Sequence, residues 1–173
     1  MEIILAENHG FCYGVKRAVE MANEAADGKG KSYTLGPIIH NPQVVGRLES
    51  KGVSPIQEVA DIDEGTMIIR SHGVGPAIYA EAEEKGLHIL DATCPHVKKA
   101  QQDAKSVIED GMTLVILGEK NHPEVKSINL WADNKGIIIE DEESAQKLQI
   151  VEKMGVVVQT TFSQFKFNSI IEI

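Results

Sequence analysis

The sequence has few cysteines, no long apolar run and no excess of basic residues, and each shortage narrows its possible functions. Only 2 of its 173 residues are cysteine. No apolar run approaches the roughly 20 residues that a membrane-spanning helix needs, so we expect no membrane segment. Lys and Arg number 17 against 26 Asp and Glu, and the formal net charge of −9 argues against nucleic-acid binding, which needs a basic surface.

The amino terminus also lacks a secretory signal, because it is acidic and its apolar run at residues 3–5 is short. We therefore predict a cytoplasmic protein. Its 42% apolar and 25% charged residues are typical of a soluble globular protein. The acidic charge does not exclude an anionic ligand, since helix N-termini and a few histidines can bind a phosphate locally.

The two cysteines, Cys12 and Cys94, lie at the same position in two copies of a repeating unit, at an offset of 82 residues (94 minus 12). A repeat that places one thiol at the same turn each time suggests thiols that converge on a shared centre. In a cytosolic protein, such a centre favours metal or redox chemistry over a structural disulfide. The same offset relates further pairs: Val15 and Val97, Lys16 and Lys98, Ala18 and Ala100, Ala22 and Ala104, and Leu35-Gly36 and Leu117-Gly118.

Short apolar runs alternate with helical patterns along the whole chain. Helices are predicted over residues 15–26, 77–85 and 97–108, with Pro76 and Pro95 at first turns and Gly86 and Gly111 at the ends. The apolar runs predict short buried strands at residues 3–5, 33–35, 67–69, 88–90, 113–117, 137–139 and 156–158. We therefore predict an α/β fold of parallel sheets with helices packed on their faces.

The repeat also predicts the domain organisation. Residues 1–94 form a first α/β module and residues 95–173 a second, each with a small, mostly parallel sheet flanked by helices. No Gly/Ser-rich linker separates the two modules, so we expect them to pack closely.

Each cysteine is predicted to lie in a strand-to-helix turn. Cys12 stands in Gly10-Phe11-Cys12-Tyr13-Gly14, where glycines allow a tight turn, and Cys94 immediately precedes Pro95. A helix N-terminus favours the thiolate, which is the metal-binding form of cysteine. The alternative is two buried, inert cysteines, and their matched positions in the repeat weigh against it.

Three histidines are predicted to lie in loops that follow strands. His40, His72 and His122 come after the runs at 33–35, 67–69 and 113–117, and ligands of α/β sheets bind beyond the carboxyl ends of the strands. Histidine can donate to phosphate oxygens, so these residues are candidates for phosphate binding. Each alone would be interpreted as a solvated loop residue or a capping partner. The other histidines, His9, His88 and His96, have no comparable context.

Two polar residues near these histidines are candidates for proton transfer. Glu124 lies at the start of a predicted helix, where a carboxylate is also stabilised by the helix dipole. Its functional interpretation is a proton donor or relay. Thr160, in Gln159-Thr160-Thr161, ends the last strand; it is either a polar strand end or a hydroxyl that positions a substrate oxygen.

Taken in order, these motifs resemble those of a known family. Six segments carry the resemblance: Gly10-Phe11-Cys12-Tyr13-Gly14-Val15, His40-Asn41, Ser71-His72-Gly73-Val74, Asp91-Ala92-Thr93-Cys94-Pro95, His122-Pro123-Glu124-Val125 and Gln159-Thr160-Thr161. Together they are similar to the LytB-type 4-hydroxy-3-methylbut-2-enyl diphosphate reductases of the non-mevalonate isoprenoid pathway. The resemblance implies a trefoil of three α/β modules around a [4Fe–4S] cluster, with one cysteine from each module.

The resemblance also implies an activity and residue roles. The family removes the C4 hydroxyl of its allylic diphosphate reductively, yielding isopentenyl and dimethylallyl diphosphates with electrons from a ferredoxin- or flavodoxin-like donor. By motif, Cys12 and Cys94 resemble cluster ligands. The three residues His40, His72 and His122 resemble diphosphate-binding residues, Glu124 resembles the proton donor, and Thr160 its positioning partner.

The sequence departs from the family pattern in two places, since it has no third cysteine and lacks the Ser-x-Asn segment of the third module. We therefore expect an N-terminal, two-module fragment whose third module is absent. Because iron–sulfur clusters usually take three or four cysteine ligands, we also expect this chain alone to lack the intact cluster and the activity.

Three other functions stay open on sequence grounds. The first is a non-catalytic phosphate-binding module that uses the histidine loops without a cluster. The second is a zinc site built from Cys12, Cys94 and a histidine, although the short Cys-x-x-Cys pairing typical of zinc sites is missing. The third is a dithiol switch, which requires Cα atoms within about 7 Å.

Overall fold

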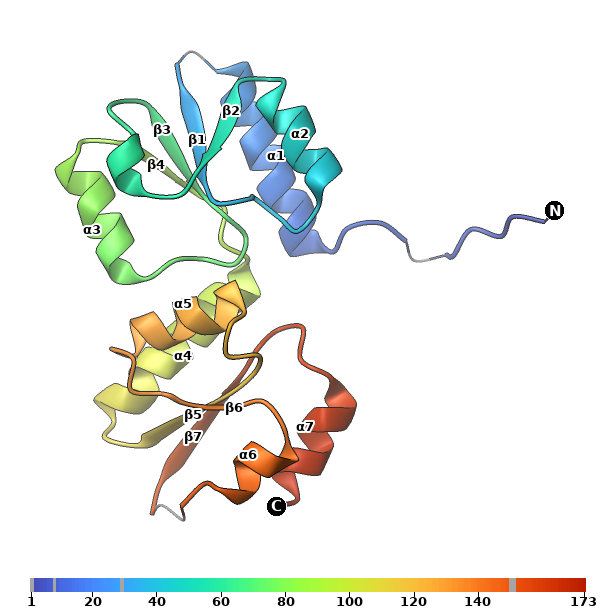
Figure 1. The fold of residues 1–173 in the computed structure, drawn as a ribbon, viewed down its shortest axis with the longest axis vertical. Helices are drawn as coiled ribbons and strands as arrows, with labels where there is room; N and C mark the ends of the chain where they lie inside the picture. Colours follow the sequence, from blue (N-terminus) through green and yellow to red (C-terminus); the bar gives the residue numbers. More distant parts are fainter. Residues whose placement is uncertain (1, 8, 29, 150–151) are drawn as a thin grey trace.

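Two parallel sheets follow one another along the chain, with helices packed on both faces of each sheet (Figure 1). The computed structural model describes residues 2–7, 9–28, 30–149 and 152–173. The first sheet has the order β2-β1-β3-β4, from β1 (Ser32–Leu35), β2 (Val53–Ile56), β3 (Thr66–Ile69) and β4 (His88–Asp91). The second has the order β6-β5-β7, from β5 (Thr113–Leu117), β6 (Ile137–Ile139) and β7 (Met154–Val158). All the pairings are parallel, which confirms the predicted α/β class.

Proline marks the start of several helices. The helices are α1 (Tyr13–Asp27), α2 (Pro42–Glu49), α3 (Pro76–Glu84), α4 (Pro95–Glu109), α5 (Pro123–Trp131), α6 (Glu142–Gln146) and α7 (Gln164–Ile171), with a short 3-10 helix η1 (Val59–Asp61). Proline opens α2, α3, α4 and α5, at the position where a helix has no use for the missing N–H. The predicted helices at 15–26, 77–85 and 97–108 correspond to α1, α3 and α4.

The sequence repeat corresponds to a structural repeat. Helices α1 and α4 are each 15 residues long, and each begins directly after its cysteine. The next strand, β1 or β5, pairs on one side with the strand that follows it and on the other with a third strand. The strands of the first sheet lie within residues 1–94 and those of the second within residues 95–173. That these ranges are separate modules stays a prediction.

The central strands are buried on both faces. In β3, Ile68 packs with α1 and α2, whereas Met67 and Ile69 pack with η1 and α3, and all three side chains are fully buried. In β5, Leu114 and Ile116 likewise pack against α4 and α5, which cover the face turned toward the first sheet (Figure 1). Because successive side chains of a strand point to opposite faces, such runs are continuously apolar rather than alternating.

The predicted strand at residues 3–5 is wrong. Ile3, Ile4 and Leu5 are 74%, 82% and 77% exposed and belong to none of the strands in the described residues. A strand requires a hydrogen-bonded neighbour, and this segment extends away from both sheets (Figure 1). Cys12 therefore does not follow a strand as predicted, although it does directly precede a helix.

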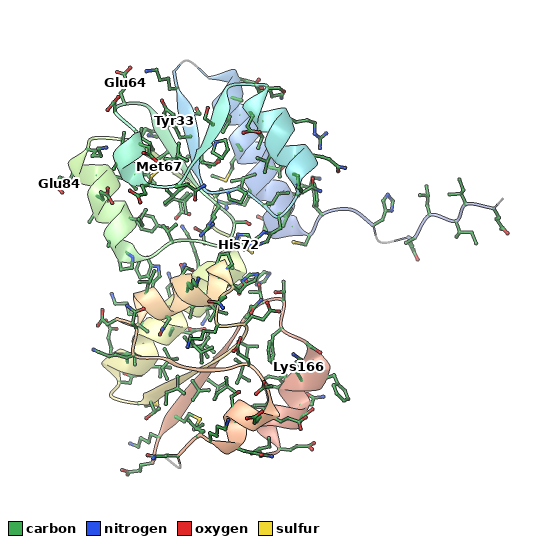
Figure 2. The ribbon with its side chains drawn as sticks, in the orientation of Figure 1. Tyr33, Glu64, Met67, His72, Glu84 and Lys166 are labelled. Atoms are coloured by element: carbon green, nitrogen blue, oxygen red, sulfur yellow. The ribbon has the colours of Figure 1, made fainter. Side chains whose placement is uncertain are left out.

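The junction is the region between the first sheet (β1–β4) and the second sheet (β5–β7), and three labelled side chains show where it lies (Figure 2). Met67 lies within the first sheet and Lys166 on α7 beside the second, whereas His72 lies at the junction between them. Within the part of the chain that the structure describes, no helix combines the length and the apolar character required to cross a bilayer.

Candidate functional site

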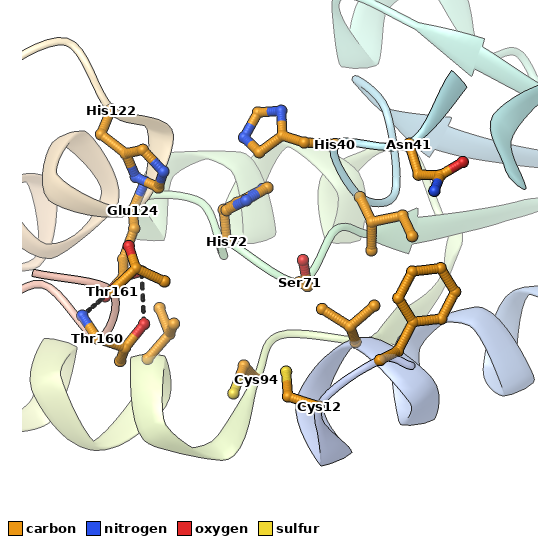
Figure 3. Close-up of a pocket in the computed structure, with 14 residues that line it drawn as sticks. Cys12, His40, Asn41, Ser71, His72, Cys94, His122, Glu124, Thr160 and Thr161 are labelled. Carbon is orange, nitrogen blue, oxygen red and sulfur yellow. Dashed lines mark hydrogen bonds between the residues drawn. The ribbon is translucent and has the colours of Figure 1, made fainter. Parts of the chain in front are cut away.

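All the residues singled out as site candidates line one cavity of about 310 Å³ at the junction (Figure 3). These are Cys12, His40, His72, Cys94, His122, Glu124 and Thr160. The cavity has a volume typical of a small-molecule site. The sequence-based candidates, which are spread over most of the chain, are therefore brought together by the fold.

Parallel strands bring these side chains to one place. His40, His72, His122 and Thr160 come after the carboxyl ends of β1, β3, β5 and β7 respectively. The carboxyl ends of parallel strands lie at the same edge of a sheet, and ligands bind there. His40 and His72 follow strands of the first sheet, and His122 and Thr160 follow strands of the second, so residues from both sheets reach one cavity.

The three histidine rings are in mutual contact. The ring centroid of His40 lies 4.4 Å from that of His72 and 5.9 Å from that of His122, and the centroids of His72 and His122 are 5.5 Å apart. One nitrogen from each ring lies within 4.8 Å of the others. Such a cluster could hold an anion through ring N–H groups, or a metal ion through ring nitrogen lone pairs.

The surroundings keep His72 neutral. Burial, together with His40, Arg70 and His122, lowers the pKa of His72 from its ordinary 6.5 to about 3. In His122, Nδ1 accepts a hydrogen bond of 3.2 Å from the backbone N–H of Glu124 and caps α5. In the neutral ring of His122, Nε2 therefore carries the proton and is available as a donor to a ligand.

Glu124 is held by Thr160 at the end of the last strand. The Thr160 N–H donates to Glu124 Oε1 at 2.6 Å, and its hydroxyl donates to Oε2 at 2.8 Å (Figure 3). The Glu124 side chain is almost fully buried. Beside them, Gln159 donates to the Thr161 hydroxyl and accepts from the N–H of Glu119, which fixes the loop that carries Thr160.

Both cysteines are free thiols at helix N-termini. Cys12 precedes α1 and is exposed, and Cys94 precedes α4 and is half-buried. A Cβ atom at Gly14 would lie only 2.4 Å from Cys94 Sγ, so glycine allows α1 to approach the second thiol closely. The two thiols thus lie on one wall of the cavity, below the histidines in Figure 3.

The metal-ligand atoms that line the cavity determine which metal ion or metal cluster could bind there. Two thiols at positively polarised helix ends fit two of the ligands of an iron–sulfur cluster, which usually takes three or four cysteines. Among the described residues, the group with compact metal-ligand geometry consists of His40, His72 and His122 and contains neither cysteine. Within the described part of the chain, Cys12, Cys94 and a histidine are not among the groups that have this compact geometry.

The cavity also contains residues that sequence reasoning did not assign a role. Asn41 lines it and caps α2, accepting a hydrogen bond from the Val44 N–H, and Ser71 lines it with its hydroxyl donating to the Ile38 carbonyl. An asparagine directly before a proline is a helix-start signal that could have identified Asn41 and α2. No comparable sequence signal marks Ser71.

A protein-family model and several known proteins match this chain. A family model described as LytB protein matches residues 3–173. A 4-hydroxy-3-methylbut-2-enyl diphosphate reductase of Geotalea uraniireducens is 48% identical over 172 residues, covering 99% of this chain and 61% of that protein. The reductase of Pelobacter propionicus is 52% identical over 163 residues, covering 94% and 58%. The chain spans less than two thirds of the length of these relatives.

Solved structures agree with this result. A structure described as (E)-4-hydroxy-3-methyl-but-2-enyl diphosphate reductase, the terminal enzyme of the non-mevalonate pathway, superposes with a TM-score of 0.87 and 43% identity. It covers 98% of this chain and 62% of that one. The E-1-hydroxy-2-methyl-but-2-enyl-4-diphosphate reductase of Plasmodium falciparum gives a TM-score of 0.91 at 32% identity, covering 96% and 54%.

Proposed function

The chain belongs to the LytB protein family, and we propose that it supplies substrate-binding and proton-transfer residues of a cytoplasmic reductase acting on 4-hydroxy-3-methylbut-2-enyl diphosphate. In this reaction the C4–O bond breaks, two electrons and two protons enter, and water leaves with isopentenyl or dimethylallyl diphosphate as product. The electrons come from a ferredoxin- or flavodoxin-like partner. The observation that carries the proposal is the convergence of three histidines, a buried glutamate and two thiols on one cavity.

The histidines bind the diphosphate group. His40 is exposed, His72 and His122 are half-buried, and the His72 ring contacts both of the other rings. Each neutral ring offers one N–H donor to an oxygen of the diphosphate. Three N–H donors from three loops thus converge on one small cavity. The histidine cluster is therefore suited to bind an anion that carries several oxygens.

Glu124 delivers a proton to the departing hydroxyl. Its carboxyl group lies in the wall of the cavity with one hydrogen bond to each oxygen from Thr160, which fixes its orientation before the substrate binds. The Thr160 hydroxyl is positioned to exchange its bond to Glu124 for one to the substrate oxygen. When Glu124 is protonated, its proton can pass to the Thr160 oxygen as the Thr160 hydroxyl proton passes to the departing substrate oxygen, without a large movement of either side chain.

Cys12 and Cys94 hold part of a [4Fe–4S] cluster. When bound, such a cluster would supply electrons one at a time and an open iron as a Lewis acid for the substrate hydroxyl. The helix N-termini behind the thiols favour the thiolate form that binds iron. Two thiolates are fewer than a four-iron cluster usually requires, so we expect neither a complete cluster nor turnover from these 173 residues alone.

Ligand binding by the chain itself provides the first test. Isothermal titration calorimetry with inorganic pyrophosphate should detect one site, and His40→Ala should weaken binding about tenfold through loss of a charge-assisted hydrogen bond. The exposed His96 provides the matched control, since His96→Ala should leave the affinity unchanged. Absence of pyrophosphate binding by the unaltered chain would contradict the proposed substrate class.

Turnover provides the second test, with the protein encoded by the whole gene. Glu124→Gln should lower the rate of dehydroxylation by about 10²–10⁴, the range typical of a lost general acid, without a comparable loss of pyrophosphate affinity. Equal turnover by this variant would rule out the proton-donor role.

A second candidate is a phosphate-binding module that has no cluster. It is favoured by the compact histidine cluster, from which both cysteines are absent. The two candidates differ in their dependence on Cys12 and Cys94. Replacement of both by serine should remove iron bound during anaerobic purification if the thiols are cluster ligands, whereas protein that never contains iron and binds pyrophosphate equally well would support the module.

A further inference from the structure

Helix α5 holds the loop that carries His72. The hydroxyl of Ser127 donates to the His72 carbonyl oxygen at 2.9 Å, and the Trp131 Nε1–H donates to the Val74 carbonyl oxygen at 2.8 Å. Ser127 and Trp131 are four residues apart on α5 and therefore share one face of the helix. The loop follows a strand of the first sheet, whereas α5 packs on the second, so these bonds cross the junction.

The Ser127 hydroxyl is fixed from its other side. Gln101 of α4 donates from Nε2 to Ser127 Oγ at 2.9 Å, and the two side chains are 3% and 2% exposed. A hydroxyl that accepts from one buried group and donates to another has a defined orientation. The chain of bonds Gln101–Ser127–His72 is thus enclosed by protein.

The loop lies directly against this chain of bonds. Gly73 has a φ of +71°, a conformation that favours glycine, and a Cβ atom there would be 2.4 Å from Gln101 Nε2. Only a residue without a side chain lets the backbone approach so closely. The main chain from His72 to Val74 is therefore fixed by contacts with α4 and α5.

The His72 ring has no comparable support of its own. Its Nδ1 atom is buried, and among the described residues it has no hydrogen-bond partner. The position of the ring consequently depends on its main chain. The same α5 carries His122 as its N-cap and Glu124 in its first turn, so one rigid helix sets the relative positions of all three groups.

We propose that Ser127 and Trp131 are positioning residues that set the place of His72 relative to His122 and Glu124 across the junction. The inference rests on the proposed function, because it gives the position of His72 a role in holding the diphosphate. It adds residues that do not line the cavity and that act through the main chain of His72 and Val74.

The test compares Ser127→Ala and Trp131→Phe with the unaltered chain. Trp131→Phe keeps an aromatic ring and removes only the N–H donor. Ser169→Ala is the matched control, since it deletes a hydroxyl that donates to a backbone carbonyl on α7, and Ser169 does not line the cavity. Two quantities are measured: the affinity for inorganic pyrophosphate, and the imidazole resonances of His72 in the ligand-free protein by NMR.

Both site variants should weaken pyrophosphate binding about tenfold, because binding groups must be held within about 0.5 Å of their productive places. Both should also shift or broaden the His72 resonances, while Ser169→Ala changes neither quantity. Folded variants with unchanged affinity and unchanged His72 resonances would overturn the proposal. If Ser127→Ala fails to fold, Trp131→Phe decides. If the unaltered chain does not bind pyrophosphate, the proposed function fails, and the His72 resonances alone decide the positioning role.

Discussion

Thr160 and Glu124 are joined by two hydrogen bonds, which connect the end of β7 to the first turn of α5. One carboxylate oxygen accepts the Thr160 N–H and the other accepts its hydroxyl. The glutamate is 2% exposed, so water does not replace either donor readily. The contact that orients Glu124, the proposed proton donor, should therefore also stabilise the fold.

Removal of the Thr160 hydroxyl tests this double role. Thr160→Val keeps the shape and the backbone N–H but leaves one oxygen of Glu124 without a partner. The free energy of unfolding should fall by about 2 kcal/mol, the usual cost of leaving a buried polar group without its hydrogen-bond partner. Urea denaturation measures the free energy of unfolding, and Thr113→Val, at the first residue of β5, is the control. Equal stability of Thr160→Val and the unaltered chain would mean that the hydroxyl contact is not maintained in solution.

Much of the fold follows from sequence patterns that are local. Continuous apolar runs at β3 and β5 predicted strands buried on both faces, and Pro95 with Gly111 predicted the ends of α4. The meeting of His40, His72 and His122 was predictable as well, because the carboxyl ends of parallel strands lie together. In each case the physical cause lies within a few residues or in a general rule of sheet topology.

Other features depend on partners that local sequence does not specify. The run at residues 3–5 has the composition of a strand, but no strand in the described residues pairs with it. Ser127 and Trp131 resemble ordinary helix residues, and their partners are carbonyl groups 55 and 57 residues away. Backbone carbonyls exist at every position, so no residue type identifies which one is contacted.

The low pKa of His72 predicts a pH-dependent stability. The unfolded chain binds a proton at His72 below about pH 6.5, whereas the folded chain does so only near pH 3, mainly because of burial. Between these values the unfolded state holds more protons, so the free energy of unfolding rises with pH and falls as the solution is acidified. The contribution is fully present above pH 6.5 and is lost as the pH falls toward 3.

His72→Gln isolates this contribution. Glutamine does not titrate, so urea midpoints measured from pH 7 to pH 4 should fall less steeply in this variant than in the unaltered chain. The exposed His96 provides the control, and His96→Gln should retain the slope of the unaltered chain. Identical slopes for all three proteins would show that His72 accepts a proton as readily in the folded as in the unfolded state.

Two helical glycines give opposite predictions for the same substitution. At Gly14 a new Cβ atom would lie 2.4 Å from Cys94 Sγ and 3.1 Å from Cys94 Cβ, whereas at Gly46 of α2 nothing lies within 4 Å. Gly14→Ala should lower the free energy of unfolding by about 1–3 kcal/mol through overpacking. Gly46→Ala should raise it by up to about 1 kcal/mol, because alanine is the better helix former.

The comparison of these two variants tests the close approach of α1 to Cys94. Because the start of α1 bears Cys12, overpacking at Gly14 should also move the two thiols apart, and their rates of reaction with a thiol reagent should change in Gly14→Ala but not in Gly46→Ala. A Gly14→Ala protein as stable as Gly46→Ala, with unchanged thiol reactivity, would mean that α1 does not pack against Cys94. The two cysteines would then not share one wall of the cavity, and their joint binding of a cluster would lose its geometric basis.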